Sequence, residues 1–342
     1  MTVPDTTVSA APESARPRRP RWKRALAITG AVLGGLVLVL GGLAAWFLYA
    51  PSADEPELAA TVERRTLEVD GMTREYVAVV PDDLPADAPI VLAFHGSRMD
   101  AEGLRGASGY RFDELAVERG FVAVYPEGFK QTWHDCRAST PYPARIRDVD
   151  DVAFARAVVA DVAALDGAGA DMVFATGLSN GGHMSIRLAE EAPDLVQGIA
   201  PFAAAYPAPS NNECEASGAA VPTMLVLGSD DPINPFEGGE AGGFAGSLGQ
   251  VLSAEESAAF VAERNGLSMT PQVAAFANTD AAGASDVTVT AYDGAAPVLL
   301  FSVDGGGHVV PNPVYAQPRI MGGTTEFLDG PQAAVDFFLG AA

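Results

Sequence analysis

The sequence predicts an α/β protein built on a mostly parallel sheet, and three observations support this fold class. Short apolar runs, typical of strands buried on both faces, alternate with helix-like segments along the chain. A Gly-x-Ser-x-Gly pattern falls between one such strand and a helix. The 342 residues are 48% hydrophobic, enough for one large domain with appendages. We also expect an antiparallel hairpin at the start of the sheet and one transmembrane helix before it.

The N-terminal part of the chain has the pattern of a membrane anchor. Residues 25–50 carry no charge, and as a helix they would span roughly 39 Å, more than the roughly 30 Å of a hydrocarbon core. Trp46 and Tyr49 stand near the outer end, as interfacial aromatics do. Residues 1–24 carry six basic groups and predict a disordered cytoplasmic tail, with everything after Ala50 exported. A cleaved signal peptide is the alternative, and the apolar length favours the uncleaved anchor.

The rest of the chain is strongly acidic. We expect a linker over 51–62 and a single catalytic domain over 63–342. Beyond the basic tail, 15 basic and 42 acidic groups remain, a formal charge of −27. This charge excludes a nucleic-acid partner, because phosphate contacts need cations.

No cofactor or metal ion is expected. The four histidines are scattered, and Asp150-Asp151 lacks the ligand spacing of a calcium loop. The glycines of 305–307 precede a histidine rather than opening a helix, so they do not form a dinucleotide fingerprint.

The first half of the domain alternates strands with helices. Residues 66–80 predict a hairpin that turns at Asp70-Gly71. Apolar runs predict buried strands over 89–94, 121–126 and 172–175. Helices are expected over 112–119, over 150–165 with Asp150 as the cap, and after the serine motif.

The second half continues the alternation. Strands are expected over 223–228, 287–292 and 298–303. The glycine-rich residues 237–249 are a candidate flap. Ser253 and Glu256 form a capping box for a helix that ends near Gly266. A final helix is expected over 331–339.

The serine motif predicts a nucleophile. A strand-turn-helix with Gly177-x-Ser179-x-Gly181 is the nucleophile-elbow pattern. The turn is so tight that side chains two residues before and after the serine would collide with the strand and the helix. The helix aims its N-terminal amides at negative charge that forms beside the serine.

A serine nucleophile needs a base and an acid. In this kind of fold they follow in the order serine, acid, histidine. Asp231 and His308 come in that order, each after a predicted strand, and His308 is the one histidine beyond Asp231. Asp230 is the alternative acid. The oxyanion hole is expected to use the amides of Asn180 and Ser97.

The remaining candidates are aromatic side chains and cysteines. His95, Trp133, His134 and His183 are candidate substrate-binding residues. For His95 the first interpretation is that it holds its loop by hydrogen bonds. His183 is otherwise a packing residue, and His134 is otherwise a solvent-facing loop residue. Cys136 and Cys214 are the two cysteines, and both lie in polar loops beyond the apolar segment. We therefore expect them to form a disulfide in an exported domain, with two free thiols as the alternative.

Together these motifs resemble the polyhydroxybutyrate depolymerase and feruloyl esterase-like family of α/β-hydrolases. The resemblance covers roughly residues 64–339 and is carried by an ordered set: Phe94-His95-Gly96, Val124-Tyr125-Pro126-Glu127-Gly128 with Trp133, Asp150-Asp151-Val152, Ala175 to Gly182, Gly228 to Pro232 and Gly305 to His308. It implies the α/β-hydrolase fold, secreted carboxylester hydrolysis of small or polymeric esters, and Asp231 as the acid.

Two positions depart from that family's pattern. Val309-Val310-Pro311 stands where the family usually has a tryptophan before the proline, and His134 stands where asparagine is usual. Both are expected at the substrate pocket, so they affect substrate class more than mechanism. The competing functions are a serine peptidase on the same fold and a ligand-binding envelope protein that has lost catalysis.

Overall fold

The computed structural model describes residues 21–276, 286–325 and 327–340. The chain divides into two units, Met1–Tyr49 and Ala50–Ala342. Most of the predicted basic tail, residues 1–20, lies outside the described residues.

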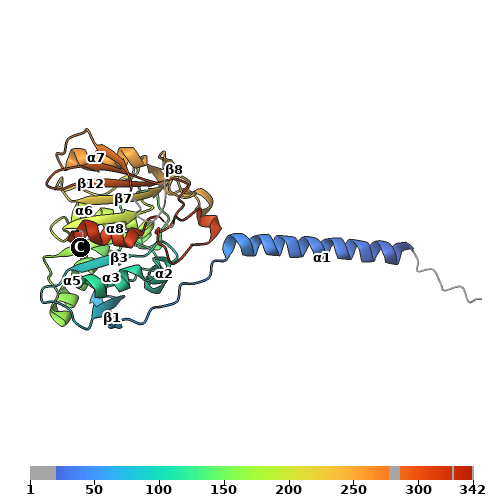
Figure 1. Ribbon diagram of the computed structural model, residues 1–342, viewed down its shortest axis with the longest axis horizontal. Helices are drawn as coiled ribbons and strands as arrows, with labels where there is room; N and C mark the ends of the chain where they lie inside the picture. The colour runs from blue at the N-terminus through green and yellow to red at the C-terminus, as the bar shows by residue number, and fades with distance from the viewer. Residues whose placement is uncertain (1–20, 277–285, 326, 341–342) are drawn as a thin grey trace, which may run out of the picture. The chain divides into compact units, whose positions relative to one another are not determined.

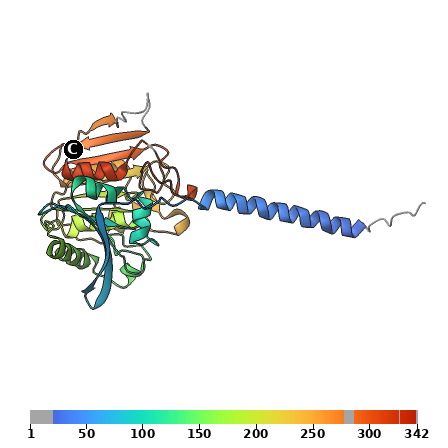
Figure 2. The same ribbon diagram turned by 60° about the horizontal axis from the view of Figure 1, so that its bottom comes forward.

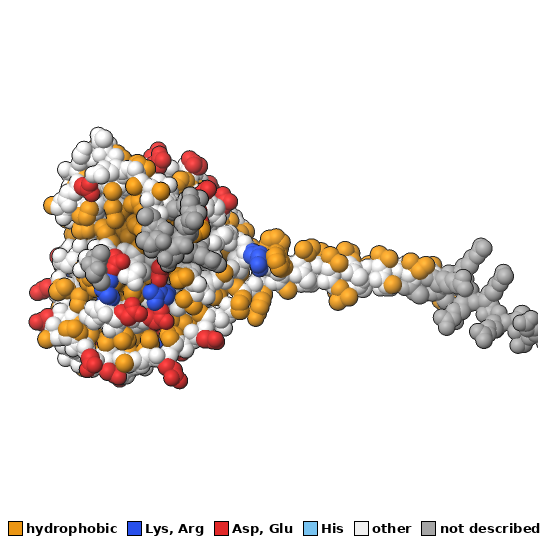
Figure 3. Space-filling view, in the orientation of Figure 1, with side chains coloured by type: hydrophobic (Ala, Val, Ile, Leu, Met, Phe, Trp, Pro, Cys, Tyr) orange, Lys and Arg blue, Asp and Glu red, His pale blue; other side chains and the backbone are white. Residues whose placement is uncertain are grey.

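The N-terminal unit contains one long helix, α1 (Arg21–Leu48). Orange hydrophobic side chains run along its length in Figure 3. By length and composition, its segment Ile28–Leu48 is apolar enough to cross a membrane. A signal sequence passes the same test, so the helix is compatible with an uncleaved membrane anchor and with a cleaved signal peptide.

The unit Ala50–Ala342 is built on a ten-stranded sheet with helices on both faces (Figure 1). In spatial order its strands are β1 (Ala60–Val69), β2 (Met72–Pro81), β4 (Val122–Pro126), β3 (Ile90–Phe94), β5 (Val173–Leu178), β6 (Gly198–Phe202), β7 (Thr223–Gly228), β12 (Val298–Val303), β11 (Val287–Tyr292) and β10 (Gln272–Ala275). The six central strands, β4 to β12, are parallel. The β1–β2 hairpin at one edge is antiparallel and turns at Asp70-Gly71, as predicted (Figure 2).

Alternation along the central strands divides the core between the two faces of the sheet. In β3, Ile90, Leu92 and Phe94 pack in the cluster that includes α5 (Asp151–Asp166), α6 (Asn180–Glu191) and α7 (Ala254–Arg264). Val91 and Ala93 point into the opposite cluster. That cluster includes the helices α2 (Ala101–Ala107), α3 (Arg111–Arg119) and α8 (Gly330–Leu339). A strand buried on both faces therefore reads as a continuous apolar run.

Several predicted details are confirmed. Asp150 caps α5, and Ser253 and Glu256 form the capping box of α7. The predicted strands over 287–292 and 298–303 coincide with β11 and β12.

Other elements were not predicted. β6 contains a proline and a glycine, which argue against a central strand, and β10 is a short exposed edge strand. Two helices were not predicted, α2 and the four-residue helix α4 (Pro143–Ile146). The sequence also did not predict that β11 pairs antiparallel with β12 and that β10 pairs antiparallel with β11 at the edge of the sheet. β1 begins at Ala60, inside the segment expected to be a linker, and Glu55 pairs with Arg105 at 2.6 Å.

The glycine-rich segment 237–249 forms a small ribbon rather than an open loop. β8 (Gly239–Ala241) and β9 (Gly249–Val251) pair antiparallel, with the 3₁₀ turn η2 (Gly243–Ala245) between them. Two further 3₁₀ turns, η1 (Pro209–Asn211) and η3 (Arg319–Met321), complete the described elements.

The predicted disulfide between Cys136 and Cys214 is present, with their Cα atoms 4.9 Å apart. Backbone hydrogen bonds accompany it: Glu213 N–H donates to the Cys136 carbonyl and Ala138 N–H to the Asn211 carbonyl. The disulfide therefore joins the loop after β4 to the segment after β6.

Candidate active site

Ser179 occupies the sharp turn between β5 and α6. Its backbone has φ 56° and ψ −117°, a left-handed conformation that costs energy for any residue with a side chain. Ser179 N–H donates to the carbonyl of Phe202 at 2.9 Å, which ties the turn to the neighbouring strand β6. The surrounding fold holds the serine in this conformation, as the sequence pattern predicts.

The glycines beside Ser179 are required by close backbone packing. A Cβ on Gly177 would lie 2.5 Å from the carbonyl oxygen of Phe94, at the end of β3. A Cβ on Gly181 would overlap the same carbonyl group, and one on Gly182 would meet the Cβ of Ala204 at 2.8 Å. Residues with side chains are therefore excluded at these positions, as expected from the motif.

His308 is held by Asp231. The imidazole Nδ1 lies 2.8 Å from Oδ2 and 3.0 Å from Oδ1 of Asp231, and both side chains are buried. The amides of Ile233 and Asn234 each donate to Asp231 Oδ1 at 2.8 Å, which fixes the carboxylate. Asp230 is exposed, and only its backbone takes part, through a hydrogen bond from its N–H to the Gly306 carbonyl. Of the two neighbouring aspartates, Asp231 is therefore the one whose side chain bonds to the histidine.

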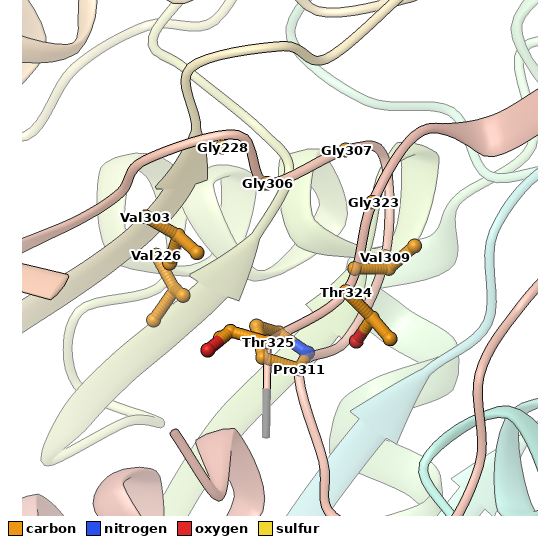
Figure 4. Close-up of a pocket in the computed structure, with 10 residues that line it drawn as sticks. All are labelled: Val226, Gly228, Val303, Gly306, Gly307, Val309, Pro311, Gly323, Thr324 and Thr325. Carbon is orange, nitrogen blue, oxygen red and sulfur yellow. The ribbon is translucent and has the colours of Figure 1, made fainter. Parts of the chain in front are cut away.

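The glycine-containing loop before His308 packs tightly against neighbouring backbone segments around Gly228 and Gly323 (Figure 4). A Cβ on Gly307 would come within 2.5 Å of the Gly322 Cα, and one on Gly228 would overlap the Gly306 carbonyl. A cavity of about 10 Å³, roughly the size of one water molecule, lies among Val226, Gly307, Thr324 and their neighbours. The run of glycines before the histidine thus allows three backbone segments to approach one another.

Ser179 and His308 line one cavity of about 420 Å³. The residues that line it are Gly96, Ser97, Arg98, Met99, Lys130, Thr132, Pro141, Tyr142, Pro143, Leu178, Ser179, Ile233, Phe244, Leu248, His308, Gln317 and Met321. Ser97 reaches it from the loop after β3, and Phe244 and Leu248 reach it from the ribbon of β8 and β9. In the described structure Ser179 and His308 are not hydrogen-bonded to each other, although such contacts often tighten only when substrate binds.

A buried polar network holds Asn180, the residue after the serine. Its side-chain oxygen accepts from Trp133 N–H at 2.8 Å, and its amide nitrogen donates to Trp133 O at 3.1 Å and to Asp135 Oδ2 at 2.6 Å. Arg137 in turn pairs with Asp135 at 2.6 Å. Burial alone would raise the pKa of Asp135, but the Arg137 guanidinium outweighs it and holds that pKa below its usual range. Sequence reasoning missed Asp135 and Arg137, because charged residues in a loop give no signal of burial.

Four residues predicted to contact the substrate lie outside the cavity lining in this structure, and His95 and Trp133 are two of them. Both are buried, and neither is among the residues that line the cavity. His95 Nε2 accepts from Gly128 N–H at 2.9 Å, so its Nδ1 carries the proton and donates to the Gly96 carbonyl at 2.8 Å. Trp133 Nε1 donates to the His95 carbonyl at 2.9 Å. These residues support the loop that carries Ser97, and holding this loop by hydrogen bonds is the role expected for His95.

His134 and His183 also lie outside the cavity lining. His134 N–H donates to Asp151 Oδ2 at 2.8 Å. His183 Nδ1 lies 2.9 Å from the Ser179 carbonyl, which is an acceptor, so Nδ1 donates. His134 is one departure from the family pattern, and Val309 and Val310 belong to the other. These two valines are also buried and do not line the cavity. Both departures therefore belong to the packing around the site and not to its wall.

No cluster of metal ligands is found within the described residues, where no group of three or more His, Cys, Asp or Glu side chains is suitably placed. What the site offers is a strained serine, a buried Asp–His pair and a largely apolar cavity. This combination is suited to acyl transfer through a serine.

The fold and this arrangement define an α/β-hydrolase. The acetyl xylan esterase from Aspergillus awamori has the same fold, with a TM-score of 0.51, 18% identity, and coverage of 73% of this chain and 95% of that one. No family model matches the sequence.

A relative named "Putative esterase NocK", from Nocardia uniformis subsp. tsuyamanensis, is 31% identical over 310 residues, which cover 85% of this chain and 87% of that protein. The chain therefore belongs to this esterase family and is a carboxylic ester hydrolase.

Replacing Gly181 by alanine tests the packing of the elbow. Gly181→Ala must push α6 away from the Phe94 carbonyl, so we expect a loss of about 3 kcal/mol or more in the free energy of unfolding. Gly198→Ala is the matched control, because its Cβ would make an ordinary contact of 3.4 Å with the Pro222 carbonyl, and we expect a change of at most about 1 kcal/mol. Urea unfolding of a fragment from Ala50 measures both. Equal losses in the two variants would contradict the packing argument.

His183 should make stability depend on pH. Burial, aided by the Arg137 charge, lowers its pKa to about 3, whereas the unfolded chain has a histidine pKa of about 6.5. As pH falls below about 6.5 the unfolded state takes up a proton that the folded state does not, so stability is lost with falling pH.

His183→Asn removes this titration and can keep the donor to the Ser179 carbonyl. Between pH 7.5 and 5.0 the variant should lose about 2 kcal/mol less unfolding free energy than the unmodified protein. Comparing the two pH differences cancels any change in overall stability. An identical pH difference in both proteins would show that burial does not lower the pKa of His183.

Proposed function

We propose that this esterase uses a Ser179–His308–Asp231 triad and acts outside the cytoplasmic membrane, held there by α1. The observation that carries the triad is the buried Asp231–His308 pair, 2.8 Å apart, whose histidine lines the same cavity as the elbow serine. The loop geometry supports Asp231 over Asp230 as the acid, because Asp230 is exposed and its side chain does not reach the histidine.

The proposed reaction proceeds through an acyl-enzyme. His308 takes the proton of the Ser179 hydroxyl as the serine attacks the ester carbonyl, and it returns that proton to the leaving alcohol. Water then attacks the acyl-enzyme by the same route and releases the acid. Asp231 keeps the Nδ1 proton on the imidazole and stabilises the imidazolium that forms.

The oxyanion is assigned to the amides of Asn180 and Ser97. Asn180 is the first residue of α6, where the amides and the helix dipole favour negative charge. Its side chain is fastened to Trp133 and Asp135, so the amide is held rigidly. Ser97 lines the cavity on a loop supported by His95 and Trp133.

The finer likeness to polyhydroxybutyrate depolymerases and feruloyl esterases is part of the proposal. It is supported by the ordered motifs and by the apolar side chains of the cavity, including Met99, Tyr142 and Phe244, which suit an acyl chain or an aromatic ring. The name of the acetyl xylan esterase adds esters of a polysaccharide to the substrates that merit assay.

Two observations support the location. The Cys136–Cys214 disulfide is typical of oxidising compartments. The apolar segment Ile28–Leu48 follows a basic N-terminal region, and the positive-inside rule keeps such a region in the cytoplasm.

Substitution of the triad tests the mechanism. Ser179→Ala and His308→Ala should each lower kcat for a p-nitrophenyl acetate by about 10⁴- to 10⁶-fold, because the three side chains act as a unit. Asp231→Asn should cost less than Ser179→Ala, since the base remains and only its orientation is disturbed. The assay uses a fragment that begins at Ala50, so that the whole of β1, which begins at Ala60, is included.

Asp230→Asn is the matched control, with an expected change of less than about threefold, because the side chain is exposed. A large loss in Asp230→Asn with little loss in Asp231→Asn would move the acid by one residue. Near-normal turnover in Ser179→Ala would refute the triad. Labelling of the unmodified protein by a fluorophosphonate, and not of Ser179→Ala, separates an active hydrolase from a binding protein.

The location is tested by access to protease. In intact spheroplasts of a bacterial host, added protease should remove the catalytic unit, because the positive-inside rule places it outside. A cytoplasmic marker protein should stay intact as the control. Protection of the catalytic unit until lysis would reverse the proposed orientation.

A further inference from the structure

The walls of the active-site cavity carry two basic side chains that form no ion pair in the described part of the chain. Residues 51–342 carry only 15 basic groups against 42 acidic ones. Eleven of the basic side chains form ion pairs with carboxylates: Arg64, Arg65, Arg74, Arg105, Arg111, Arg119, Arg137, Arg145, Arg156, Arg187 and Arg264. In so acidic a unit, a cation without a partner is the exception.

Arg98 and Lys130 are two such exceptions, and both line the cavity. In the described part of the chain neither forms an ion pair, and both are exposed. None of the 17 residues that line the cavity is an aspartate or a glutamate. The cavity wall therefore carries positive charge in a unit whose formal charge is −27.

A backbone hydrogen bond joins the two loops that carry these cations. Arg98 has φ 64° and Lys130 has φ 49°, and both are left-handed conformations that non-glycine residues seldom adopt. Arg98 N–H donates to the carbonyl of Gln131, the residue after Lys130, at 2.9 Å. The loop after β3 and the loop after β4 are thus joined where they present their charges. Strain of this kind persists where the surrounding structure enforces it, often at binding sites.

We propose that the cavity binds esters that carry a carboxylate group, with Arg98 and Lys130 as the residues that recognise it. The inference rests on the proposed function and names its substrate class. A guanidinium offers paired N–H donors that match a carboxylate, and an ammonium adds a point charge. The net charge of the unit repels anions, so an anionic substrate needs local cations at the cavity. The apolar lining accommodates the rest of the molecule.

The test measures selectivity, defined as kcat/KM for an anionic ester divided by kcat/KM for its neutral amide analogue. One pair, p-nitrophenyl hydrogen adipate and p-nitrophenyl adipamate, places the charge on the acyl side. The other pair, 4-acetoxybenzoate and 4-acetoxybenzamide, places it on the alcohol side. The full chain in a nonionic detergent is assayed at about 50 mM salt, where exposed charges are least screened. Taking a ratio within each variant cancels differences in folding or in active fraction.

Arg98→Gln and Lys130→Gln should each lower selectivity about 2- to 5-fold, and the double variant about 5- to 20-fold, in at least one of the two pairs. Arg147→Gln is the matched control. Arg147 is also exposed, forms no ion pair among the described residues, and lies over the same Phe129 ring as Lys130, but it does not line the cavity. Its selectivity should stay within about twofold of that of the unmodified protein.

Unchanged selectivity in the double variant, in both pairs, would overturn the proposal. An equal fall in Arg147→Gln would also overturn it, because the effect would then come from overall charge and not from the cavity. Failure of the unmodified protein to cleave either neutral ester would instead refute the proposed catalytic function, and this inference with it.

Discussion

The contact between the start of α6 and the end of β3 is the constraint on which the site depends. The Phe94 carbonyl leaves no room for a Cβ at Gly177 or Gly181, so helix and strand approach at backbone distance. That approach forces Ser179 into its left-handed conformation. It also brings the serine turn beside the loop that follows Phe94 and carries Ser97. The proposed nucleophile and one proposed oxyanion donor are thus positioned by a single packing contact.

The elements that could be predicted are those whose signal is local. β11 alternates valine with threonine and β12 is a mostly apolar run, and both patterns are typical of strands. The caps of α5 and α7 are encoded by side chains within one turn of the helix. β6 could not be predicted from local pattern, because its proline and glycine are tolerated only through its pairing with β5 and β7.

The same distinction applies to the site. The proposed roles of Ser179 and His308 follow from motif and chain order, whereas the preference for Asp231 also depends on how one loop folds around its carboxylate. His95, Trp133 and His183 looked like pocket residues because aromatic and titratable side chains near a nucleophile often touch substrate. All three are buried, and the loop after β4 contributes to this through Gly128 and Trp133, which bond to His95. The Asp135–Arg137 pair of the same loop has no local signature. The burial of polar groups through long-range contacts is therefore what the local sequence pattern does not show.

The Cys136–Cys214 bond lies in that same loop, one residue from Asp135 and three from Trp133, both of which hold Asn180. The covalent link and the hydrogen bonds to the residue after the nucleophile are thus part of one assembly. Thiol oxidation during maturation therefore bears on the shape of the catalytic turn as well as on the durability of the fold. Chains produced in a reducing cytoplasm would lack this constraint, so recombinant production calls for an oxidising host compartment.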